Sequence, residues 1–353
     1  MTVIDQAQTI REGEELDVSA VDNWLKSHVE GLAGTPTIRQ FPGGSSNLTY
    51  LIRYDNRELI LRRPPFGTKA KSAHDMGREY RVMSALKPVY PYVPEMVAYC
   101  EDESVLGCEF YAMDRLKGII PRKELPEGLN LSESDVSALC KAVVDRLIDL
   151  HKIDYKAAGL ESLGKGWGYV DRQIDGWSKR YVNAKTDDVP GYEKVMEWLD
   201  ANRQEQIGVC VVHGDYRFDN VVLNPDQPTE VIGVLDWEMA TLGDPLMDLG
   251  NTLSYWIEAN DPPPMHMMRL QPTHLKGMMS RSEVFDYYCR QMGFKDVNFS
   301  FYRVYGLFRV AVILQQIYYR FYHGQTQDQR FAAYGQVVNF LEQLCLQEIA
   351  TGN

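Results

Sequence analysis

The stretch VVHGDYRFDNVVLN, residues 211–224, brings together side chains that could act in one reaction. Apolar residues flank it on both sides, which predicts two short strands with a polar loop held between them. Within the loop, Asn220 follows Asp215 by five residues. A carboxylate can accept the proton of an attacking hydroxyl, and an amide oxygen is a hard ligand of Mg²⁺. This pattern favours phosphoryl transfer, a reaction that depends mainly on positioning and electrostatics.

Further motifs supply the other groups that phosphoryl transfer needs. Sixteen residues after Asn220, Asp236 ends an apolar strand, where a second metal ligand is expected. Earlier in the chain, Arg62 places a cation on a strand, and Glu79 on the next helix is its expected ion-pair partner. The turn FPGGSSN can offer backbone N–H groups to phosphate oxygens through Gly43, Gly44, Ser45, Ser46 and Asn47. The order of these features is that of a nucleotide-binding lobe followed by a catalytic loop.

Periodicity predicts the elements that position these groups. The expected strands cover residues 37–41, 48–54, 58–63, 96–101 and 108–116, with the turn DESVLG between the last two. The expected helices cover residues 18–29, 76–86 and 132–151, followed by aromatic-rich helices over about the last hundred residues. The chain therefore changes from strands to helices near residues 113–118, and we expect the boundary between two lobes there.

The composition indicates a globular protein and argues against several classes of partner. The chain has 353 residues, 44% of them hydrophobic and 24% charged. No apolar run is long enough to cross a bilayer, and the first residues lack the basic-then-apolar order of a signal peptide, so we expect a cytoplasmic protein. A net charge of -12 makes nucleic acid and anionic membranes poor partners. The oligomeric state stays open.

The cysteines indicate a reducing compartment. Six are scattered among apolar neighbours without a CxxC pair, which is typical of buried thiols rather than of a disulfide framework or a zinc site. They are Cys100, Cys108, Cys140, Cys210, Cys289 and Cys345.

Several motifs resemble those of known kinases. The spacing from Asp215 to Asn220 is that of D-x-x-x-x-N in the protein kinase catalytic loop, with HGD where protein kinases have HRD. HGDYRFDN, VLDWEMATLGDPLMDLG, LILRRPP, GREYRVMSAL and LHKID are similar to motifs of the aminoglycoside phosphotransferase and choline kinase superfamily. Within it, the chain resembles the branch found as stand-alone bacterial proteins and as kinase-like domains fused to acyl-CoA dehydrogenases in animals. The resemblance covers about residues 35–335.

The resemblance implies an α+β, protein-kinase-like fold with two lobes. The small β-rich N-lobe would comprise residues 1–114, and the larger, mainly helical C-lobe residues 115–353. It implies ATP and Mg²⁺ as cofactors, Asp215 as the catalytic base, and Asn220 and Asp236 as the metal ligands. It further implies a phosphate-orienting pair, Arg62 with Glu79, and a hinge that receives adenine at Met113, Asp114 and Leu116.

One position departs from the family pattern. The aminoglycoside enzymes usually carry Lys where this chain has Arg62, whereas relatives of choline kinase can carry Arg. The planar guanidinium suits phosphate oxygens, and the neighbouring Arg63 is an alternative contact.

Other polar residues near the motifs have structural explanations. We expect His213 to brace the loop through hydrogen bonds and His151 to be a core histidine. Asp244 precedes Pro245 as a helix N-cap should, and Asp248 is expected to make internal hydrogen bonds.

Two functions follow from these features. The first is an ATP-dependent phosphotransferase that acts on the hydroxyl of a small molecule. The alternative is a catalytically silent nucleotide-binding regulatory module of kinase-like fold. Such a module would be expected to have lost the base or a metal ligand, whereas Asp215, Asn220 and Asp236 are all present. A protein kinase is a third reading, disfavoured by HGD, by DWE in place of DFG and by the lack of an APE segment.

The charge distribution bears on the acceptor. Residues 262–353 hold nine Lys or Arg against six Asp or Glu. Aminoglycosides and choline are cations, so a mildly basic C-terminal segment favours a neutral or anionic acceptor. A hydroxylated acyl-CoA is one candidate, suggested by the fusion architecture of the relatives.

Overall fold

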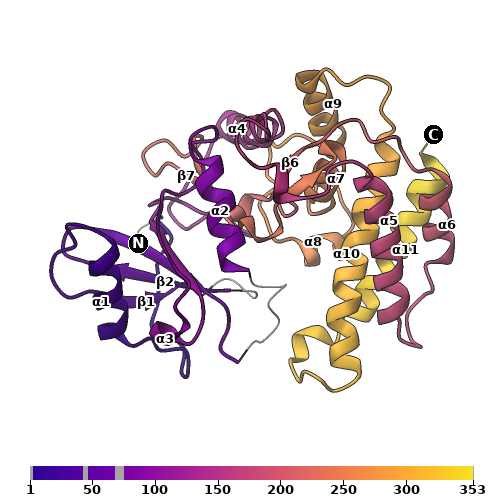
Figure 1. Ribbon diagram of the computed structural model, residues 1–353. Coiled ribbons are helices and arrows are strands. Elements are labelled where there is room, and N and C mark those ends of the chain that lie inside the picture. Colours follow the sequence, from indigo (N-terminus) through magenta and orange to yellow (C-terminus); the bar gives the residue numbers. More distant parts are fainter. Residues whose placement is uncertain (1–2, 43–46, 68–74, 353) are drawn as a thin grey trace.

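The N-terminal part of the chain folds around an antiparallel sheet. Figure 1 shows the computed structural model, which describes residues 3–42, 47–67 and 75–352. The sheet has five strands in the order β1-β2-β3-β5-β4. Their bounds are β1 Thr37–Gln40, β2 Leu48–Arg53, β3 Glu58–Arg63, β4 Met96–Cys100 and β5 Phe110–Asp114. In the register of β3 and β5, Arg62 lies opposite Tyr111.

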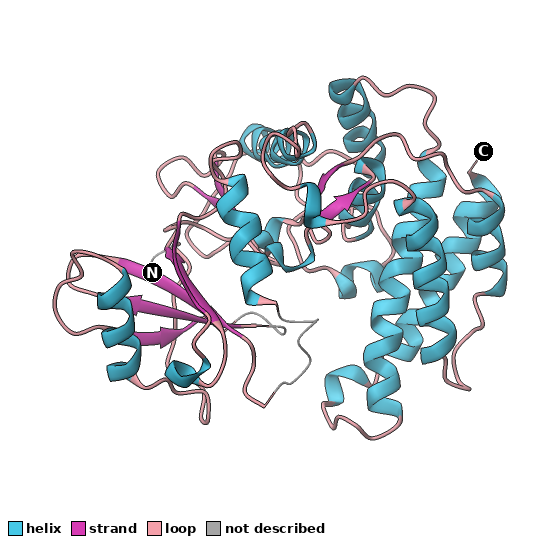
Figure 2. Cartoon of the chain, in the orientation of Figure 1, coloured by secondary structure: helices cyan, strands magenta, loops and turns pink. Residues whose placement is uncertain are grey.

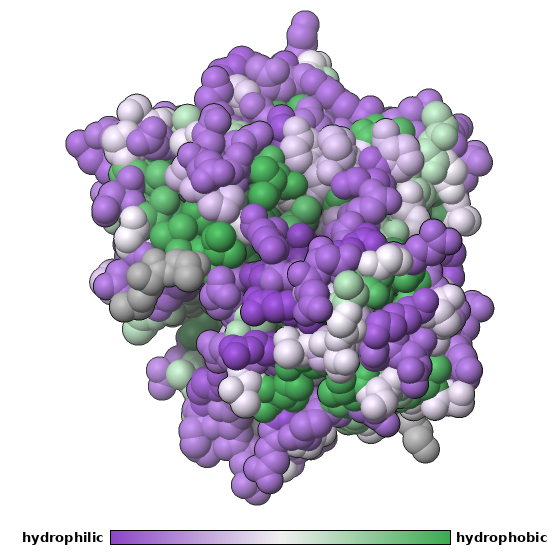
Figure 3. Space-filling model, turned by 90° about the vertical axis from the view of Figure 1, so that its left-hand side faces the viewer, coloured by the Kyte–Doolittle hydropathy of each residue, from purple (hydrophilic) through white to green (hydrophobic). Residues whose placement is uncertain are grey.

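Helices cover the two faces of this sheet. Helix α1, Val18–His28, packs Val21 and Leu25 against the face that carries Leu59 and Leu61. On the other face, α2, Met76–Leu86, contacts β4 and β5. Successive side chains of a strand point to opposite faces, so Ile60 joins the core on the α2 side. Figure 3 views the molecule from the side of the N-terminal sheet, the left-hand side of Figure 1. On this face hydrophilic side chains predominate, and hydrophobic ones gather in separate patches.

The rest of the chain is mainly helical, with two short two-stranded sheets (Figure 2). Its helices are α4 Glu133–His151, α5 Tyr169–Ala184, α6 Glu193–Ala201, α7 Pro245–Ser254, α8 Pro263–Met268, α9 Arg281–Met292, α10 Phe299–Tyr322 and α11 Tyr334–Thr351, whereas the one-turn helix α3, Glu103–Leu106, lies between β4 and β5. The short strands are β6 Cys210–Val212 with β9 Thr241–Gly243, and β7 Val221–Leu223 with β8 Val231–Val234. Single 3₁₀ turns are η1 Glu161–Leu163, η2 Phe218–Asn220, η3 Trp237–Met239 and η4 Gln329–Phe331.

Helix α10 is the centre of the C-lobe. It packs against α11, α7 and α5, and its first half is buried on all sides (Figure 1). Helices α10 and α7 approach each other closely. A Cβ added to Gly306 of α10 would lie only 2.5 Å from the carbonyl oxygen of Gly250 in α7. Two glycines therefore permit a helix–helix approach that larger residues would prevent.

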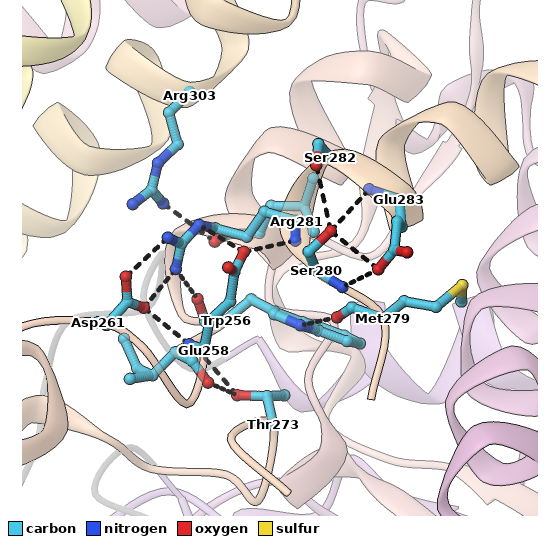
Figure 4. Close-up of polar contacts among 12 residues, drawn as sticks. Trp256, Glu258, Asp261, Thr273, Met279, Ser280, Arg281, Ser282, Glu283 and Arg303 are labelled. Atoms are coloured by element: carbon cyan, nitrogen blue, oxygen red, sulfur yellow. Dashed lines mark hydrogen bonds and ion pairs between the residues drawn. The ribbon is translucent and has the colours of Figure 1, made fainter. Parts of the chain in front are cut away.

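The half-buried guanidinium of Arg281 ties the segment after α7 to α9 (Figure 4). The two nitrogens Nη1 and Nη2 of Arg281 lie 2.5 and 2.8 Å from the two carboxylate oxygens of Asp261. Nη1 also donates to the carbonyl of Trp256, at 2.8 Å, and Nε lies 3.2 Å from Glu258. Burial alone would lower the pKa of Arg281, but the hydrogen bond to Asp261 and the surrounding carboxylates raise it. The loop between α7 and α9 is thus fixed by a charge-assisted network.

The predicted α+β fold with two lobes is confirmed. The helix over 76–86 and the strand over 58–63 have the predicted bounds, and Asp75 caps α2 by accepting from the N–H of Arg78. The strand expected over 108–116 is shorter, since it ends at Asp114, and the DESVLG turn contains the one-turn helix α3. We propose Asp114, the last residue of β5, as the end of the N-lobe. Within the described ranges, no helix has the combined length and apolarity needed to span a bilayer.

Candidate functional site

A cavity of about 370 Å³ lies where the sheet meets the short strands of the C-lobe. Most of the residues singled out in the sequence line it: Asn47, Arg62, Met113, Asp114, Leu116, Asp215, Asn220 and Asp236. Glu79 is buried behind Arg62 and contacts it directly. Gly43, Gly44, Ser45 and Ser46 lie outside the described residues. The fold therefore gathers residues from both lobes, far apart in sequence, around one space.

Asp248 of α7 holds the loop that carries Asp215 through two backbone hydrogen bonds. One oxygen of Asp248 accepts the backbone N–H of His213, and the other accepts that of Gly214, both at 2.8 Å. His151 Nε2 lies 3.1 Å from the same carboxylate. Burial would raise the pKa of Asp248, but the hydrogen bonds and charges of His151 and His213 lower it below its usual value. The predicted internal role of Asp248, the core position of His151 and the N-cap role of Asp244 are confirmed.

The backbone of the same loop is braced on its other side. His213 Nε2 lies 3.0 Å from the carbonyl oxygen of Leu235, next to Asp236. Gly214 has a φ of +81°, and a Cβ there would lie 3.0 Å from the carbonyl oxygen of Met239. Glycine is required at this position for both reasons. The bracing role predicted for His213 is confirmed.

The side chains of Asp215 and Asn220 are in direct contact, and both residues line the cavity. The amide nitrogen of Asn220 donates to the backbone carbonyl of Asp215, at 2.9 Å, and to its carboxylate, at 3.3 Å. Because the nitrogen is used within the loop, the amide oxygen is the atom that a cation would take. The N–H of Leu235 donates to the carbonyl of Asn220, at 2.8 Å, which brings Asp236 close to Asn220.

Asp236 adopts an unusual backbone conformation. Its φ of 68° and ψ of 62° lie in the left-handed region, which is uncommon for residues other than glycine but is best tolerated by Asn and Asp. Asp236 lies two residues after the end of β8 and is the N-cap of the 3₁₀ turn η3. Its carboxylate and the amide oxygen of Asn220 line one cavity, and hard oxygen donors of this kind suit Mg²⁺.

Arg62 connects the two lobes at the inner end of the cavity. Its Nη1 donates to Glu79 Oε1 at 2.8 Å, and its Nη2 donates to Asp236 Oδ1 at 3.1 Å. Glu238 lies 3.7 Å from Nη2 and accepts a hydrogen bond from Asn47, at 2.9 Å. Burial would lower the pKa of Arg62, but the negative charges of Glu79, Asp236 and Glu238 raise it well above the usual value. Arg62 therefore stays charged in a buried position.

Arg63 points away from the cavity. Its Nε donates to the carbonyl of Pro64 and its Nη1 to that of Leu106, at 3.1 and 3.3 Å, and its guanidinium lies 3.8 Å from the ring centre of Phe66. Adjacent residues of a strand face opposite sides, so only one of the two arginines can reach the cavity. The structure places Arg62 there.

The residues predicted to form the hinge lie where β5 ends. Met113 is buried at the cavity wall, and Leu116 follows two residues after the strand ends. The carboxylate of Asp114 is held by Arg57 through two hydrogen bonds of 2.8 and 3.0 Å. A base at the hinge would meet the backbone of Asp114 rather than its side chain.

Two arginines beside Asp215 were not singled out from the sequence. Arg217 Nη2 lies 3.2 Å from Asp215 and its Nε 3.2 Å from Asp219, while its guanidinium stacks 4.8 Å from the ring centre of Tyr255. Arg309, from α10, donates to the carbonyl of Gly214 at 2.8 Å. The position of Arg217 two residues after the base was a usable signal. Arg309 is 95 residues from Gly214, and nothing local indicated it.

Comparison with known proteins gives a consistent result. The model of a family described as "Phosphotransferase enzyme family" matches residues 37–272, more than half of the chain. A solved structure from Ralstonia eutropha, classed with the aminoglycoside phosphotransferases, is 30% identical with a TM-score of 0.82, covering 96% of this chain and 100% of that one.

Two longer proteins are also similar. Mouse acyl-CoA dehydrogenase family member 10 is 36% identical over 327 residues, which cover 91% of this chain and 30% of the mouse protein. Human acyl-CoA dehydrogenase family member 11 is 32% identical over 344 residues, covering 94% of this chain and 43% of the human protein. The chain thus spans less than half the length of these relatives, and the resemblance to this branch that the sequence motifs suggested is confirmed.

Proposed function

Since this chain belongs to the phosphotransferase enzyme family, we propose that it transfers the γ-phosphate of ATP to the hydroxyl group of a small molecule. The observation that carries the proposal is the position of Asp215. Its carboxylate lines the same cavity as Arg62, Asn220 and Asp236, so a base, a cation and hard metal ligands face one space. This is the set of groups that transfer of a phosphoryl group to a hydroxyl requires.

Each residue has a distinct role in the proposed reaction. Asp215 accepts the proton of the acceptor hydroxyl as the oxygen attacks phosphorus. Arg62, kept in place by Glu79, orients the phosphate oxygens. Asn220 and Asp236 would hold Mg²⁺, which neutralises charge on the β- and γ-phosphates when bound. The backbone hydrogen bonds to Asp248 keep the loop fixed, so little rearrangement is needed during transfer.

The C-terminal residues 262–353, with nine Lys or Arg against six Asp or Glu, favour a neutral or anionic acceptor. Arg217, which lines the cavity, is paired with Asp215 and Asp219. A cationic acceptor such as an aminoglycoside would be disfavoured by the basic C-terminal segment. A hydroxylated acyl-CoA fits this charge, and two relatives are named acyl-CoA dehydrogenase family members, although most of their length lies outside the matching region. We propose this class as the first acceptor to test.

The direct test is release of ADP from MgATP in the presence of acceptors. The panel comprises hydroxyacyl-CoAs, hydroxy acids, thiosugars, choline, ethanolamine and aminoglycosides. We expect Asp215→Asn to lower acceptor-stimulated turnover by about 10²- to 10⁴-fold, the usual contribution of a general base, while MgATP still binds. Asp226→Asn, which removes an exposed carboxylate from the turn after β7, is the matched control and should retain turnover.

Two results would contradict the proposal. Undiminished turnover in Asp215→Asn would remove the assigned base. Tight binding of MgATP without release stimulated by any acceptor would support the silent nucleotide-binding module instead.

A further inference from the structure

Residues 5–8 are fixed beside the cavity by backbone hydrogen bonds. The backbone N–H of Asp5 donates to the carbonyl of Gly118, at 3.0 Å, just after the hinge. Three residues later, Gln8 exchanges two backbone hydrogen bonds with Gln40 at the end of β1, at 2.7 and 3.0 Å. Ala7 between them is buried in the main core. This segment therefore bridges the hinge and the strand that leads into the glycine-rich turn.

Side chains reinforce the position of Asp5. Arg115 donates from Nη2 to the backbone carbonyl of Asp5, at 2.5 Å, and from Nη1 to Glu58, at 2.9 Å. The Asp5 carboxylate is paired with Arg122 at 2.6 Å, and its side chain is only 17% exposed. Both Asp5 and Arg122 line the cavity next to Leu116 and Gly118. A carboxylate from the far N-terminus is thus built into the wall of the candidate nucleotide site.

The other acidic residues of the cavity have different partners. Asp114 is held by Arg57, Asp236 by Arg62, and Asp215 with Asp219 by Arg217. Asp5 lines the cavity beside the chain that follows the predicted hinge, where its N–H donates to Gly118 and its carboxylate is paired with Arg122.

We propose that Asp5 accepts hydrogen bonds from the ribose hydroxyls of the bound nucleotide, which makes residues 3–8 part of the nucleotide site. This inference rests on the function proposed above. A ribose lies between base and phosphates, and an Asp or Glu carboxylate is a common acceptor for its hydroxyl groups. Arg122 donates to both carboxylate oxygens, from Nη1 at 2.6 Å and from Nη2 at 3.3 Å. Because each oxygen can accept two hydrogen bonds, one position on each is left for the sugar.

Arg122 also explains how an acidic group is tolerated near a triphosphate. Its guanidinium neutralises the charge of Asp5. The side chain of Arg122 is 48% exposed, so solvent screens this pair and it contributes modestly to stability. We therefore assign the pair to binding rather than to stability.

Nucleotide binding without any acceptor tests the inference. Calorimetric titration compares MgATP with 2′-deoxyATP and 3′-deoxyATP on the wild type and on Asp5→Ala. Because hydrogen bonds to charged groups are the strong ones, we expect the wild type to bind ATP at least about tenfold more tightly than one of the deoxy analogues. Asp5→Ala should bind all three nucleotides with the same affinity, close to that of the wild type for the weaker analogue.

Glu12→Ala is the matched control, because it removes an exposed carboxylate from the same N-terminal segment. It should keep the preference for ATP. Thermal unfolding without nucleotide shows whether each variant is folded at the titration temperature.

Three outcomes would overturn the inference. One is a wild type that binds ATP and both deoxy analogues equally. Another is an Asp5→Ala variant that keeps the wild-type preference for ATP. The third is an Asp5→Ala variant that loses affinity for all three nucleotides by the same factor, because Asp5 would then only stabilise residues 3–8. A wild type that binds no nucleotide at all would instead refute the proposed function, and the inference with it.

Discussion

Arg62 of β3 and Asp236 of the segment after β8 are hydrogen-bonded to each other, with Nη2 and Oδ1 3.1 Å apart. One belongs to the sheet of the N-lobe, and the other follows β8 in the C-lobe, 174 residues later. The proposed phosphate-binding cation and the proposed metal ligand therefore contact each other directly. A metal ion at Asp236 would compete with Arg62 for the same carboxylate, and the guanidinium would then be free to bind phosphate.

Asp236→Asn should weaken the dependence on magnesium. The variant keeps a side chain that tolerates the left-handed backbone, so we expect the fold and thermal stability to be close to those of the wild type. Loss of the negative charge should raise the Mg²⁺ concentration for half-maximal ADP release at least about tenfold. A titration of MgCl₂ at fixed ATP measures this. An unchanged half-saturation value would show that Asp236 does not hold the metal.

Arg62 and Arg63 should differ in their effects, although they are neighbours. Arg62→Met leaves Glu79 buried without its partner, which should lower the free energy of unfolding by about 3–5 kcal/mol and weaken nucleotide binding. Arg63→Met removes hydrogen bonds to carbonyl groups on the opposite side of the strand, so it should alter stability but leave nucleotide affinity unchanged. Urea unfolding and calorimetric titration separate the two effects.

A double variant tests whether Arg62 acts on nucleotide binding or only through its ion pair with Glu79. Arg62→Met with Glu79→Leu removes both charges, and it should recover part of the lost stability without restoring nucleotide affinity. Recovery of both would mean that Arg62 acts only through the fold.

Asp248 should make the stability of the protein sensitive to acid. Its pKa in the folded state is lowered, because hydrogen bonds to His151 and His213 outweigh the effect of burial. A lowered folded pKa contributes stability above the unfolded value of about 3.9, and that contribution is lost as the pH falls through the folded pKa. The wild type should therefore lose stability steeply below about pH 4, while Asp248→Asn should be less stable at pH 7 and depend less on pH in this range.

Chemical denaturation at pH 7, 5, 4 and 3 measures this difference. Asp286→Asn, at an exposed position of α9, controls for the loss of one carboxylate. Parallel pH curves for the wild type and Asp248→Asn would show that another group causes the acid sensitivity.

The sequence predicted best what depends on local chemistry. Helix α2 has the predicted bounds because its apolar face, its Asp75 cap and the following Pro88 all lie within one short stretch. The juxtaposition of Asp215 with Asn220 was predictable for the same reason, since five residues of loop between two strands leave them few arrangements. The choice between Arg62 and Arg63 followed only once the strand register was known.

What the sequence did not predict depends on long-range packing. Arg309 of α10, a helix that packs against α7, donates to the carbonyl of Gly214. Asp5 reaches the cavity because Gln8 pairs with Gln40 of β1 and Asp5 itself with Gly118. Neither contact has a periodic or motif signature. The glycine-rich turn at 43–46 lies outside the described residues, and its role as a phosphate loop stays a prediction.

The backbone of Asp236 also limits how this position can change in evolution. A left-handed conformation is open at little cost to Gly, Asn and Asp, whereas β-branched or bulky residues strain it. Of these three, only Asp provides a charged ligand, so Asn and Gly would preserve the turn but weaken the proposed metal site. Either substitution is therefore expected to give a folded protein that turns over less nucleotide.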